Sequence, residues 1–590
     1  MVNSEIAELL RAVAAAYQLA GEEKNRFRII AYQRAADAVE HASSELKDLW
    51  DEGALAEIPG IGKSISEHLD ELFRIGRSKH FQSVLRGLPP QMFDLMAIPG
   101  IGAKTAYKLV KKLAISQKSA VEDLEKLAKS GMIRTLEGFG VESEKDIVKS
   151  IEEVRGRTKR HLLPYAQVIA EEVIDWLAVC PFVKRADPLG SLRRKASTVG
   201  DIDIAVASDN PKAVIDHFVS YSKAQRVLEK GDISAGIVLP GDIQVDLMVQ
   251  PPLAYGALLQ HFTGSKHHNI ALREYAIKRG LSLSEYGIKL KAKGSKLKKF
   301  STEEEFYGAL GLEWIAPELR EDMGEIAFAL KHKLPKLVEL KSIKADLQIH
   351  SSFDIETSHD LGESSFEDVI LKANGLGYEY LAFTEHNPSH SKHTESQITD
   401  LIKRKKDVID KINYSFVKSQ NGSVKKVFNS LEIDVLPNGF LPIPEKALEY
   451  LDFALISIHS SFRLAKDEMT KRVISALSHP KVKVFAHPTA RKLGKREGIE
   501  LNWKTIFNFC LKHNKWLEIN GDPMRLDLPD FLVHEAVKAG VKLTLGTDAH
   551  HIDAMDNMEY GVSVARRGWA ERKDIVNTGH LKEFEKVLKC

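Results

Sequence analysis

The chain has 590 residues, and its 84 basic and 82 acidic side chains give a formal net charge of +2 at pH 7. This length exceeds what one hydrophobic core supports and predicts three or more domains, while the balanced charge excludes a protein that binds polyanions through bulk charge alone. The three cysteines, Cys180, Cys510 and Cys590, have the spacing of neither a metal site nor a disulfide framework, so we expect a reducing, cytoplasmic compartment.

The first residues, MVNSEIAELLRAVAAAY, predict an amphipathic helix that carries Glu5 and Glu8. A secretory signal begins with basic residues and continues into an apolar run, so this start does not resemble one. No apolar run in the chain approaches the length that spans a bilayer. We therefore expect no membrane partner.

Two related segments come next, IPGIGKSISEHL at 58–69 and IPGIGAKTAYKL at 98–109, and each leads into an apolar-periodic helix. Glycines there allow a tight turn whose backbone N–H groups face outward at a helix N-terminus, which is a phosphate site that ignores base sequence. The pattern resembles the helix-hairpin-helix motif, and LEGFGVES at 136–143 resembles a degenerate third copy. An ordinary glycine-rich turn is an equal alternative for a single copy, whereas two copies favour DNA binding. The candidate DNA contacts are Gly60, Gly62, Lys63, Gly100, Gly102 and Lys104.

A pair of aspartates stands out in the middle of the chain. Asp201 and Asp203 lie in GSLRRKASTVGDIDIAV at 190–206, and Asp246 lies in IQVDLMV at 243–249. Residues i and i+2 of a β-strand point to one face, so Asp201 and Asp203 can meet the same cations, with Asp246 on a neighbouring strand. Two Mg²⁺ ions about 4 Å apart can activate an attacking oxygen and stabilise a leaving group, and carboxylates are the ligands that Mg²⁺ takes. The sequence therefore predicts a two-metal phosphoryl-transfer site.

The residues before these aspartates suit a triphosphate, because Gly190-Ser191 lets the backbone approach phosphates and Arg194 can donate charge-assisted hydrogen bonds to them. Together with HFTGSKHHNIALREYAIKRGLSLSEYG at 261–287, this arrangement resembles the family X, DNA polymerase beta-like, DNA polymerases of bacteria. The resemblance implies that Asp201, Asp203 and Asp246 are catalytic and bind Mg²⁺, that the incoming deoxynucleotide contacts Gly190, Ser191, Arg194, Gly200, Phe262, Gly264 and Asn269, and that Arg273 contacts the template strand. His261 stands where these polymerases have a tyrosine.

Some family members also remove 5′-deoxyribose phosphate with a lysine that forms a Schiff base with the abasic sugar. Alignment of GIGKSISEHLDELFRIG at 60–76 places His68 at that lysine, and Lys63 falls one position before another family lysine, where this chain has Ser64. An imidazole cannot form the imine, so we do not expect lyase chemistry by the family route unless the local geometry lets Lys63 take the place of that lysine.

From about residue 344, apolar runs recur, and most of them end in a residue type that binds metals. Helix-length stretches between them predict alternating strands and helices around a parallel, barrel-like sheet. The carboxyl ends of such strands converge at one mouth, so ligands that are scattered in the sequence would form one cluster. Mixed histidine and carboxylate ligation favours Mn²⁺, Zn²⁺ or Fe²⁺ over Mg²⁺ alone. The candidate ligands are His350, His386, Glu432, His459, His487, Asp548 and His550.

The motifs TEHNP, SIHS, AHPTAR and TDAH resemble those of the polymerase and histidinol phosphatase (PHP) domain over roughly residues 344–580. Members of that family commonly have His-x-His in the first strand, followed by an aspartate five residues after the second histidine. Here Gln348 replaces the first histidine, Ile355 occupies the aspartate position, and Asp354 lies one residue early. Glu385 stands where aspartate is usual. These departures imply a weakened or differently loaded third metal position.

The expected fold class is a multidomain α and α/β protein with a helical N-terminal region, a nucleotidyltransferase palm with a thumb, and a C-terminal distorted (β/α) PHP barrel. The expected domains are an 8-kDa-like helical domain with the first helix-hairpin-helix (1–90), a fingers-like helical domain with the second (91–150), the palm (151–255), the thumb (256–322), a linker (323–343) and the PHP barrel (344–590). Within the barrel, we expect the KRKK run at 403–406 to lie on an exposed helix.

These observations predict a template-directed DNA polymerase that fills short gaps in DNA repair with Mg²⁺, and a PHP-type 3′–5′ exonuclease that uses Mn²⁺ or Zn²⁺. Abasic-site (AP endonuclease) cleavage and 3′-phosphatase activity are additional candidate reactions of the PHP site. The expected partners are gapped or nicked DNA and deoxynucleoside triphosphates, and we expect a monomer. Two alternatives stay open: a template-independent nucleotidyltransferase core, because GS and DxD occur across that superfamily, or a PHP barrel that is only structural or DNA-binding, because of Gln348 and Ile355.

Overall fold

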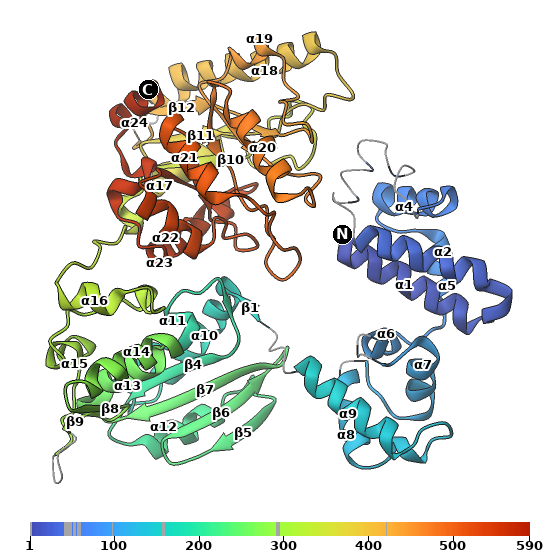
Figure 1. The fold of residues 1–590 in the computed structure, drawn as a ribbon, viewed down its shortest axis with the longest axis vertical. Helices are drawn as coiled ribbons and strands as arrows, with labels where there is room; N and C mark the ends of the chain where they lie inside the picture. The colour runs from blue at the N-terminus through green and yellow to red at the C-terminus, as the bar shows by residue number, and fades with distance from the viewer. Residues whose placement is uncertain are drawn as a thin grey trace. The chain divides into compact units, whose positions relative to one another are not determined.

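The chain folds into two compact units. In the computed structural model drawn in Figure 1, the described residues are 3–40, 46, 50, 55, 61–96, 98, 100–117, 119–155, 160–290, 296–419 and 422–589. One unit contains residues 1–159 with 459–464, and the other contains residues 160–458 with 465–590. Across the described residues, every helix is too short or too polar to cross a membrane.

The first unit is helical and has two hydrophobic cores. Its helices are α1 (Asn3–Leu19), α2 (Glu22–Glu40), α4 (Lys63–Ile75), α5 (Lys79–Leu85), α6 (Gln91–Met96), α7 (Ala103–Lys112), α8 (Ala120–Lys129), η2 (Ile133–Thr135) and α9 (Val141–Arg155). In α1 the buried positions Ile6, Leu10, Val13 and Tyr17 recur every three or four residues, which gives the helix one apolar stripe. This stripe packs in the first core, which α2, α4 and α5 share, while α6 to α9 build the second.

The first half of the second unit contains a five-stranded sheet with the order β2-β4-β7-β6-β5. Its strands are β2 (Arg185–Pro188), β4 (Ile202–Ala207), β5 (Arg226–Lys230), β6 (Ser234–Leu239) and β7 (Ile243–Gln250). Only the central pair, β4 and β7, is parallel among the pairings of this sheet. The helices packed on it are α10 (Leu163–Ala178), α12 (Pro211–Val219) and α13 (Tyr255–Thr263), with the short α11 (Gly190–Arg193) after β2 and a small β1 (His161–Leu162) and β3 (Thr198–Val199) ribbon beside it.

The face of this sheet that carries the aspartates is set by strand alternation. Ala205 and Ala207 of β4 pack with Tyr255, Leu258 and Leu259 of α13 in one buried cluster. Alternate residues of a strand share a face, so Asp203 lies on the same side of the sheet as this cluster. The helix α13 therefore covers one end of the face on which the carboxylates lie.

A mixed region follows the sheet and has its own core. Its elements are η3 (Pro252–Ala254), α14 (Lys266–Ile277), β8 (Leu281–Ser284), β9 (Gly287–Leu290), α15 (Glu303–Ala309), η4 (Pro317–Leu319) and α16 (Glu325–Leu330). The core includes Leu272, Phe306, Tyr307 and Ile315. A Cβ on Gly256 would lie 2.2 Å from the backbone of Thr302, so this glycine is what lets α13 approach the start of α15.

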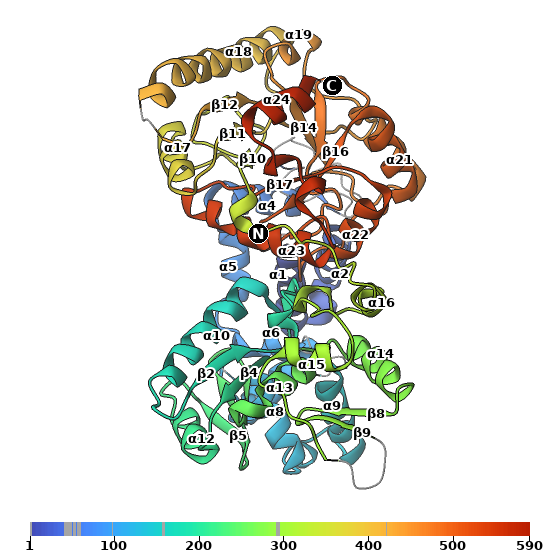
Figure 2. The ribbon, with the colours of Figure 1, turned by 90° about the vertical axis from the view of Figure 1, so that its left-hand side faces the viewer.

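The last part of the chain alternates strands and helices, as Figure 2 shows. Its parallel strands form two sheets, β10-β11-β12 and β13-β14-β15-β16-β17. Isolated parallel bridges link the two sheets: Ile349, the last residue of β10, pairs with Ala549, and His386, which follows the middle strand β11, pairs with Glu432. The strands are β10 (Ala345–Ile349), β11 (Tyr380–Phe383), β12 (Lys426–Asn429), β13 (Glu432–Asp434), β14 (Ala454–Ser457), β15 (Val482–Phe485), β16 (Trp516–Asn520) and β17 (Leu543–Gly546).

The helices of this part lie around the strands (Figure 2). They are η5 (Leu340–Ser342), α17 (Phe366–Gly375), α18 (Glu395–Ile412), η6 (Asn413–Val417), α19 (Glu445–Leu448), α20 (Lys466–Leu477), α21 (Trp503–His513), α22 (Asp530–Ala539), η7 (Ile552–Asn557), α23 (Met558–Arg567), η8 (Arg572–Asp574), η9 (Val576–Thr578) and α24 (Leu581–Lys589). Phe584 of α24 is fully buried against the rings of Tyr380, Phe428 and Phe453, so the last helix closes the core at one end of the strands.

Candidate metal centres

The three aspartates predicted to bind cations lie together. Asp203 of β4 and Asp246 of β7 are direct partners in the parallel register, and Asp201 comes immediately before β4. One carboxylate oxygen from each of the three lies within 4.8 Å of the others. Adjacent residues of neighbouring strands point to one face, so the register alone brings Asp203 and Asp246 side by side.

Two glycines leave the space that these carboxylates occupy. A Cβ on Gly190 would lie 2.6 Å from Oδ2 of Asp203, and a Cβ on Gly236 would lie 2.7 Å from Oδ1 of Asp246. Gly236 is the cross-strand partner of Asp246 in the antiparallel pair of β6 and β7. A larger residue at either position would push a carboxylate away from the cluster.

The electrostatics of the cluster favour cations. Burial raises the pKa of Asp203 to about 7, and the neighbouring charges of Asp201 and Asp246 add to the increase. Burial also raises the pKa of Asp246. Crowded carboxylates resist carrying their charges together unless positive charge is supplied. The donor set, which consists only of carboxylate oxygens, suits Mg²⁺.

Arg194, the predicted triphosphate contact, is held at the edge of this site. Its Nε donates to Glu321 at 2.9 Å, and its Nη1 donates to the carbonyl oxygen of Thr263 at 2.6 Å. Ser191 is the second residue of α11, and Gly200 directly precedes Asp201. Among the predicted nucleotide contacts, Gly190 approaches Asp203 closely and Gly200 is the chain neighbour of Asp201.

The predicted contacts on α13 and α14 touch one another. Asn269 donates from Nδ2 to the carbonyl oxygen of His261 at 2.6 Å, and Arg273 lies 3.5 Å from His261 Nδ1. The Phe262 ring packs edge-on against the His261 ring. Gly264 has φ +70°, and a Cβ there would lie 3.1 Å from Nη1 of Arg194. His261 is thus at the centre of this group and links the predicted base and template contacts.

The helix-hairpin-helix turns have the expected local geometry. Gly62 and Gly102 are the N-cap residues of α4 and α7, with nearly the same extended backbone angles and no side-chain cap. Gly100 has φ +87°, which glycine adopts without strain, and Lys63 opens α4. Lys104 is paired with Glu22 at 2.5 Å on the surface. Gly60 lies outside the described residues. A helix that begins without a side-chain cap leaves backbone N–H groups available to phosphates.

His68, which replaces the expected Schiff-base lysine, lies among aromatic rings. Its ring stacks on that of His80 at 4.1 Å, and Tyr17 hydrogen-bonds to Nε2 of His80 at 3.0 Å. Burial lowers the pKa of His68. The structure therefore gives no basis for imine chemistry at this position.

Each metal ligand predicted in the C-terminal part belongs to at least one cluster of potential donors. His350, His386, His459 and His487 follow the ends of β10, β11, β14 and β15, and Glu432 begins β13. The strand ends thus converge as parallel strands predict. The clusters are His350 with Glu432 and Asp548; Glu432 with His459 and His487; His350 with His386 and His550; and His359 with His386, Asp434 and His459.

The donors of these clusters fit divalent cations. Burial opposes ionisation of Glu432, but the surrounding histidines hold its pKa well below the ordinary value. Nε2 of His350 lies 3.1 Å from Oδ1 of Asp548 and 3.3 Å from Oε2 of Glu432, and Nε2 of His487 lies 2.8 Å from Oε1 of Glu432. Imidazole nitrogens and carboxylate oxygens thus share small buried volumes, and a cation held between them would balance the carboxylate charge. Imidazole and carboxylate together suit Mn²⁺ or Zn²⁺.

Gln348 and Ile355 stand where the PHP family has metal ligands, and the structure shows what each of them contacts instead. Gln348 lies between two candidate ligands, since its Nε2 donates to Glu432 at 2.6 Å and lies 3.4 Å from Oδ1 of Asp548. Ile355 is fully buried and supplies no donor. Asp354 is exposed and accepts from the backbone N–H of Glu356. Neither residue near the expected aspartate position therefore joins a cluster.

Two donors were missed by the sequence analysis. Asp434 shares β13 with Glu432 and lies two residues after it, so strand alternation places both on one face; that spacing was a usable signal. His359 lies in an irregular segment after β10 and has no periodic signal.

The KRKK run corrects a further expectation. Lys403 and Arg404 are exposed on α18, but Lys405 is fully buried. Its Nζ pairs with the buried carboxylate of Glu385 and donates to the carbonyl oxygen of Phe383 at 3.0 Å. The expectation of an exposed run was wrong at this position, because Lys405 falls on the apolar stripe of the helix.

A guanidinium of α23 connects the C-terminal part with the part of the same unit that carries the three aspartates. Arg567 donates from Nη1 to the carbonyl oxygen of Arg194 at 2.7 Å. The same group lies 3.0 Å from Glu321 and 2.6 Å from Asp530. Glu321 is therefore shared by Arg567 and Arg194.

Comparison with known proteins extends along the whole chain. Three family models match, "Helix-hairpin-helix domain" at residues 1–78, "SAM-like Helix-hairpin-helix tandem" at 93–153 and "DNA polymerase beta thumb" at 258–321. These matches confirm the helix-hairpin-helix and thumb predictions.

Three relatives cover different shares of the chain. It is 32% identical over 595 residues to "DNA polymerase/3'-5' exonuclease PolX" of Bacillus subtilis, which covers 100% of both chains. It is 25% identical to "DNA polymerase lambda" of Arabidopsis thaliana over 354 residues, 54% of this chain and 62% of that protein. It is 23% identical to a "Probable phosphatase" of Caldicellulosiruptor saccharolyticus over 205 residues, 32% of this chain and 74% of that protein.

Proposed function

Because the chain belongs to family X of the DNA polymerases, in the group that joins a DNA polymerase to a 3′–5′ exonuclease, we propose that Asp201, Asp203 and Asp246 form its polymerase active site. The observation that carries this assignment is the parallel pairing of β4 with β7, which sets Asp203 opposite Asp246. The reaction is template-directed addition of deoxynucleotides to a primer 3′-hydroxyl.

The aspartates would hold two Mg²⁺ ions, which neutralise the triphosphate and make the primer hydroxyl more acidic. Asp246 accepts a hydrogen bond from Gln244 at 2.8 Å through Oδ2, which leaves Oδ1 for the reaction. Asp246 lies in the same cluster as the two other carboxylates, beside the cation that would activate the primer hydroxyl. We assign Asp246 the role of accepting the proton from the primer hydroxyl.

The triphosphate would bind beside α11. Two of the five N–H donors of Arg194 are used by Glu321 and Thr263, so the remaining donors are available to phosphate oxygens. The backbone of Gly190-Ser191 approaches the aspartates closely, because no Cβ intervenes at residue 190. Gly200, Phe262 and Gly264 complete the proposed nucleotide contacts.

The nucleic acid would be held by the helix-hairpin-helix turns and by the thumb. The turns of α4 and α7 bind backbone phosphates without regard to sequence. Asn269 and Arg273 would meet the base pair and the template strand. We propose that the substrate is gapped or nicked DNA, that the protein acts as a monomer, and that it works in the cytoplasm, where its DNA and nucleotide substrates are.

We assign the 3′–5′ exonuclease to the clusters at the strand ends of residues 345–550, which we propose form a PHP-type barrel. Bound Mn²⁺ or Zn²⁺ would supply the Lewis acidity that phosphodiester hydrolysis needs. Glu432 belongs to two of the donor clusters, so its carboxylate would contact the cations of both. His350, His459 and His487 would bind and orient the cations around it. Gln348, which contacts Glu432, would hold this carboxylate in place instead of acting as a ligand.

Paired variants test both assignments in the full chain. Asp246→Ala should abolish primer extension and leave binding of gapped DNA and 3′-end digestion unchanged. His459→Ala combined with His487→Ala should abolish 3′-end digestion and leave extension unchanged. Retained extension by the first variant, or retained digestion by the second, would show that the site lies elsewhere.

A further inference from the structure

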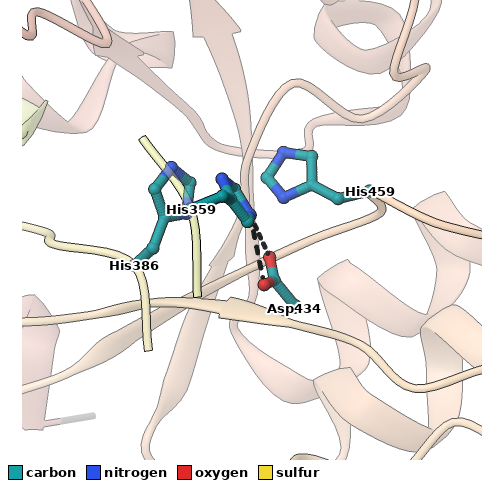
Figure 3. A group of neighbouring side chains, drawn as sticks. All are labelled: His359, His386, Asp434 and His459. Atoms are coloured by element: carbon teal, nitrogen blue, oxygen red, sulfur yellow. Dashed lines mark hydrogen bonds and ion pairs between the residues drawn. The ribbon is translucent and has the colours of Figure 1, made fainter. Parts of the chain in front are cut away.

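The C-terminal part contains a group of donors that the sequence motifs do not predict (Figure 3). His359, His386, Asp434 and His459 each offer one ligand atom, and these atoms all lie within 4.8 Å of one another. Nε2 of His359 lies 3.2 Å from Oδ2 of Asp434. In Figure 3 the His359 ring stands between those of His386 and His459, with the Asp434 carboxylate below it. Four donors from four separate segments thus face one small volume.

The third cation position implied by the PHP resemblance lacks one of its expected ligands in this chain. Its expected aspartate is replaced by Ile355, which is fully buried and apolar. The cluster nearest to that arrangement contains only the three imidazoles of His350, His386 and His550. Without a carboxylate, nothing in this set balances the charge of a divalent ion.

Ring geometry weakens that position further. The rings of His350 and His550 are stacked at 4.2 Å with planes only 13° apart. A coordinated metal lies about 2.1 Å from the nitrogen, along a lone pair in the ring plane. Planes that are inclined by only 13° at this separation meet far beyond coordination distance, so the two rings cannot both direct a lone pair at one ion. The rings of His359 and His386, in contrast, are inclined by 45° at 3.8 Å, so their planes intersect.

The donor set of the unexpected group matches a transition metal. Three imidazoles and one carboxylate give four ligands of the types that Zn²⁺ takes in a tetrahedral site, and Mn²⁺ tolerates the same donors. Asp434 is positioned for this purpose, because its Oδ2 accepts from the hydroxyl of Ser358 at 2.9 Å and its backbone N–H donates to Asn387 at 2.8 Å. The Asp434 and His359 side chains remain partly exposed, at 22% and 13%, so an ion can enter.

We propose that His359, His386, Asp434 and His459 bind a divalent cation, Zn²⁺ or Mn²⁺, at a position that replaces the one lost with the aspartate at residue 355. His386 would then serve this ion instead of the stacked pair of His350 and His550. His459 would bind through one ring nitrogen here and through the other with Glu432 and His487. The role of this ion in hydrolysis rests on the exonuclease assignment made above, but its binding is a separate property.

The test is metal binding by the purified full-length protein. Crystals loaded with Zn²⁺ and measured at the zinc absorption edge should show an anomalous peak among His359, His386, Asp434 and His459. The metal content of dialysed protein should fall by one ion per chain in both His359→Ala and Asp434→Asn. His390→Ala is the matched control, because His390 is exposed on a neighbouring loop and belongs to none of the clusters among the described residues, and it should keep the full metal content.

Primer extension by each variant serves as the check that the chain remains folded, since that reaction is assigned to other residues. Unchanged metal content in both variants would overturn the proposal, and so would loss of all ions by a variant that still extends primers. Absence of the anomalous peak would overturn it whatever the variants do. A bound ion at this position in a protein without 3′-end digestion would uphold the metal site and refute the exonuclease assignment instead.

Discussion

Adding one methyl group at Gly236 tests how closely the polymerase reaction depends on the position of Asp246. The two residues are direct partners across β6 and β7, and a Cβ at residue 236 would lie 2.7 Å from Oδ1 of Asp246. Ordinary contact begins at 3.4 Å, so Gly236→Ala must move the carboxylate by the difference, about 0.7 Å. Misplacing a reacting group by 1 Å can cost about 100-fold, which scales to roughly 25-fold for this displacement.

The assay is single-nucleotide addition to a gapped primer–template with Mg²⁺, from which kcat/KM is obtained. Digestion of 3′ ends by the same preparation should not change, because its donors lie on other strands. Gly308→Ala is the matched control, since a Cβ there meets no atom within 4 Å, and it should extend primers normally. If kcat/KM of the Gly236→Ala enzyme stays within twofold of that of the unmodified protein, the placement of Asp246 at the reacting hydroxyl is refuted.

Two further predictions concern buried ion pairs. Glu303→Gln leaves the buried Arg320 without its carboxylate, which should cost about 3 kcal/mol of unfolding free energy at pH 7, measured by urea unfolding, while Glu304→Gln on the exposed side should cost nothing measurable. Burial opposes the ionisation of Glu303, but its arginine partners lower its pKa to about 2, below the usual value of about 4.3. The contribution of the pair is therefore complete above about pH 4.3 and should vanish as the pH falls through 2. Lys405→Met leaves Glu385 as an unpaired buried charge and should destabilise the C-terminal part by roughly 3–5 kcal/mol in thermal unfolding; adding Glu385→Gln should recover part of this loss, and strictly additive losses would contradict the pairing.

The sequence predicts the aspartate cluster well because its signal is local. Asp201 and Asp203 are one residue apart, and apolar residues on both sides identify the strands. The pairing of β4 with β7 is different in kind, because β5 and β6 lie between them in the chain and no local pattern specifies which strand is central. The glycines that make room for the carboxylates depend on this pairing, so Gly236 carries no signal in the sequence.

The C-terminal donors show the same limit. Ligands at strand ends were predictable because parallel strands bring those ends together. Asp434 follows from the alternation that was already applied to the aspartate pair, and Lys405 follows from the helical stripe of α18. His359 follows from neither, since it reaches the cluster from an irregular segment whose path is fixed by tertiary packing. Its position required the folded structure.

The guanidinium of Arg567 means that the chain cannot be cut after the thumb without loss of contacts to the first part of the same unit. It bonds to the backbone of Arg194 and to Glu321, so a residue some 370 positions away supports the loop proposed to hold the nucleotide. A fragment truncated after the thumb would lose this support and leave Glu321 with one cation fewer. The two enzymatic parts are therefore not independent of each other. A protein engineered from either part alone needs another cation to replace Arg567 beside Arg194 and Glu321.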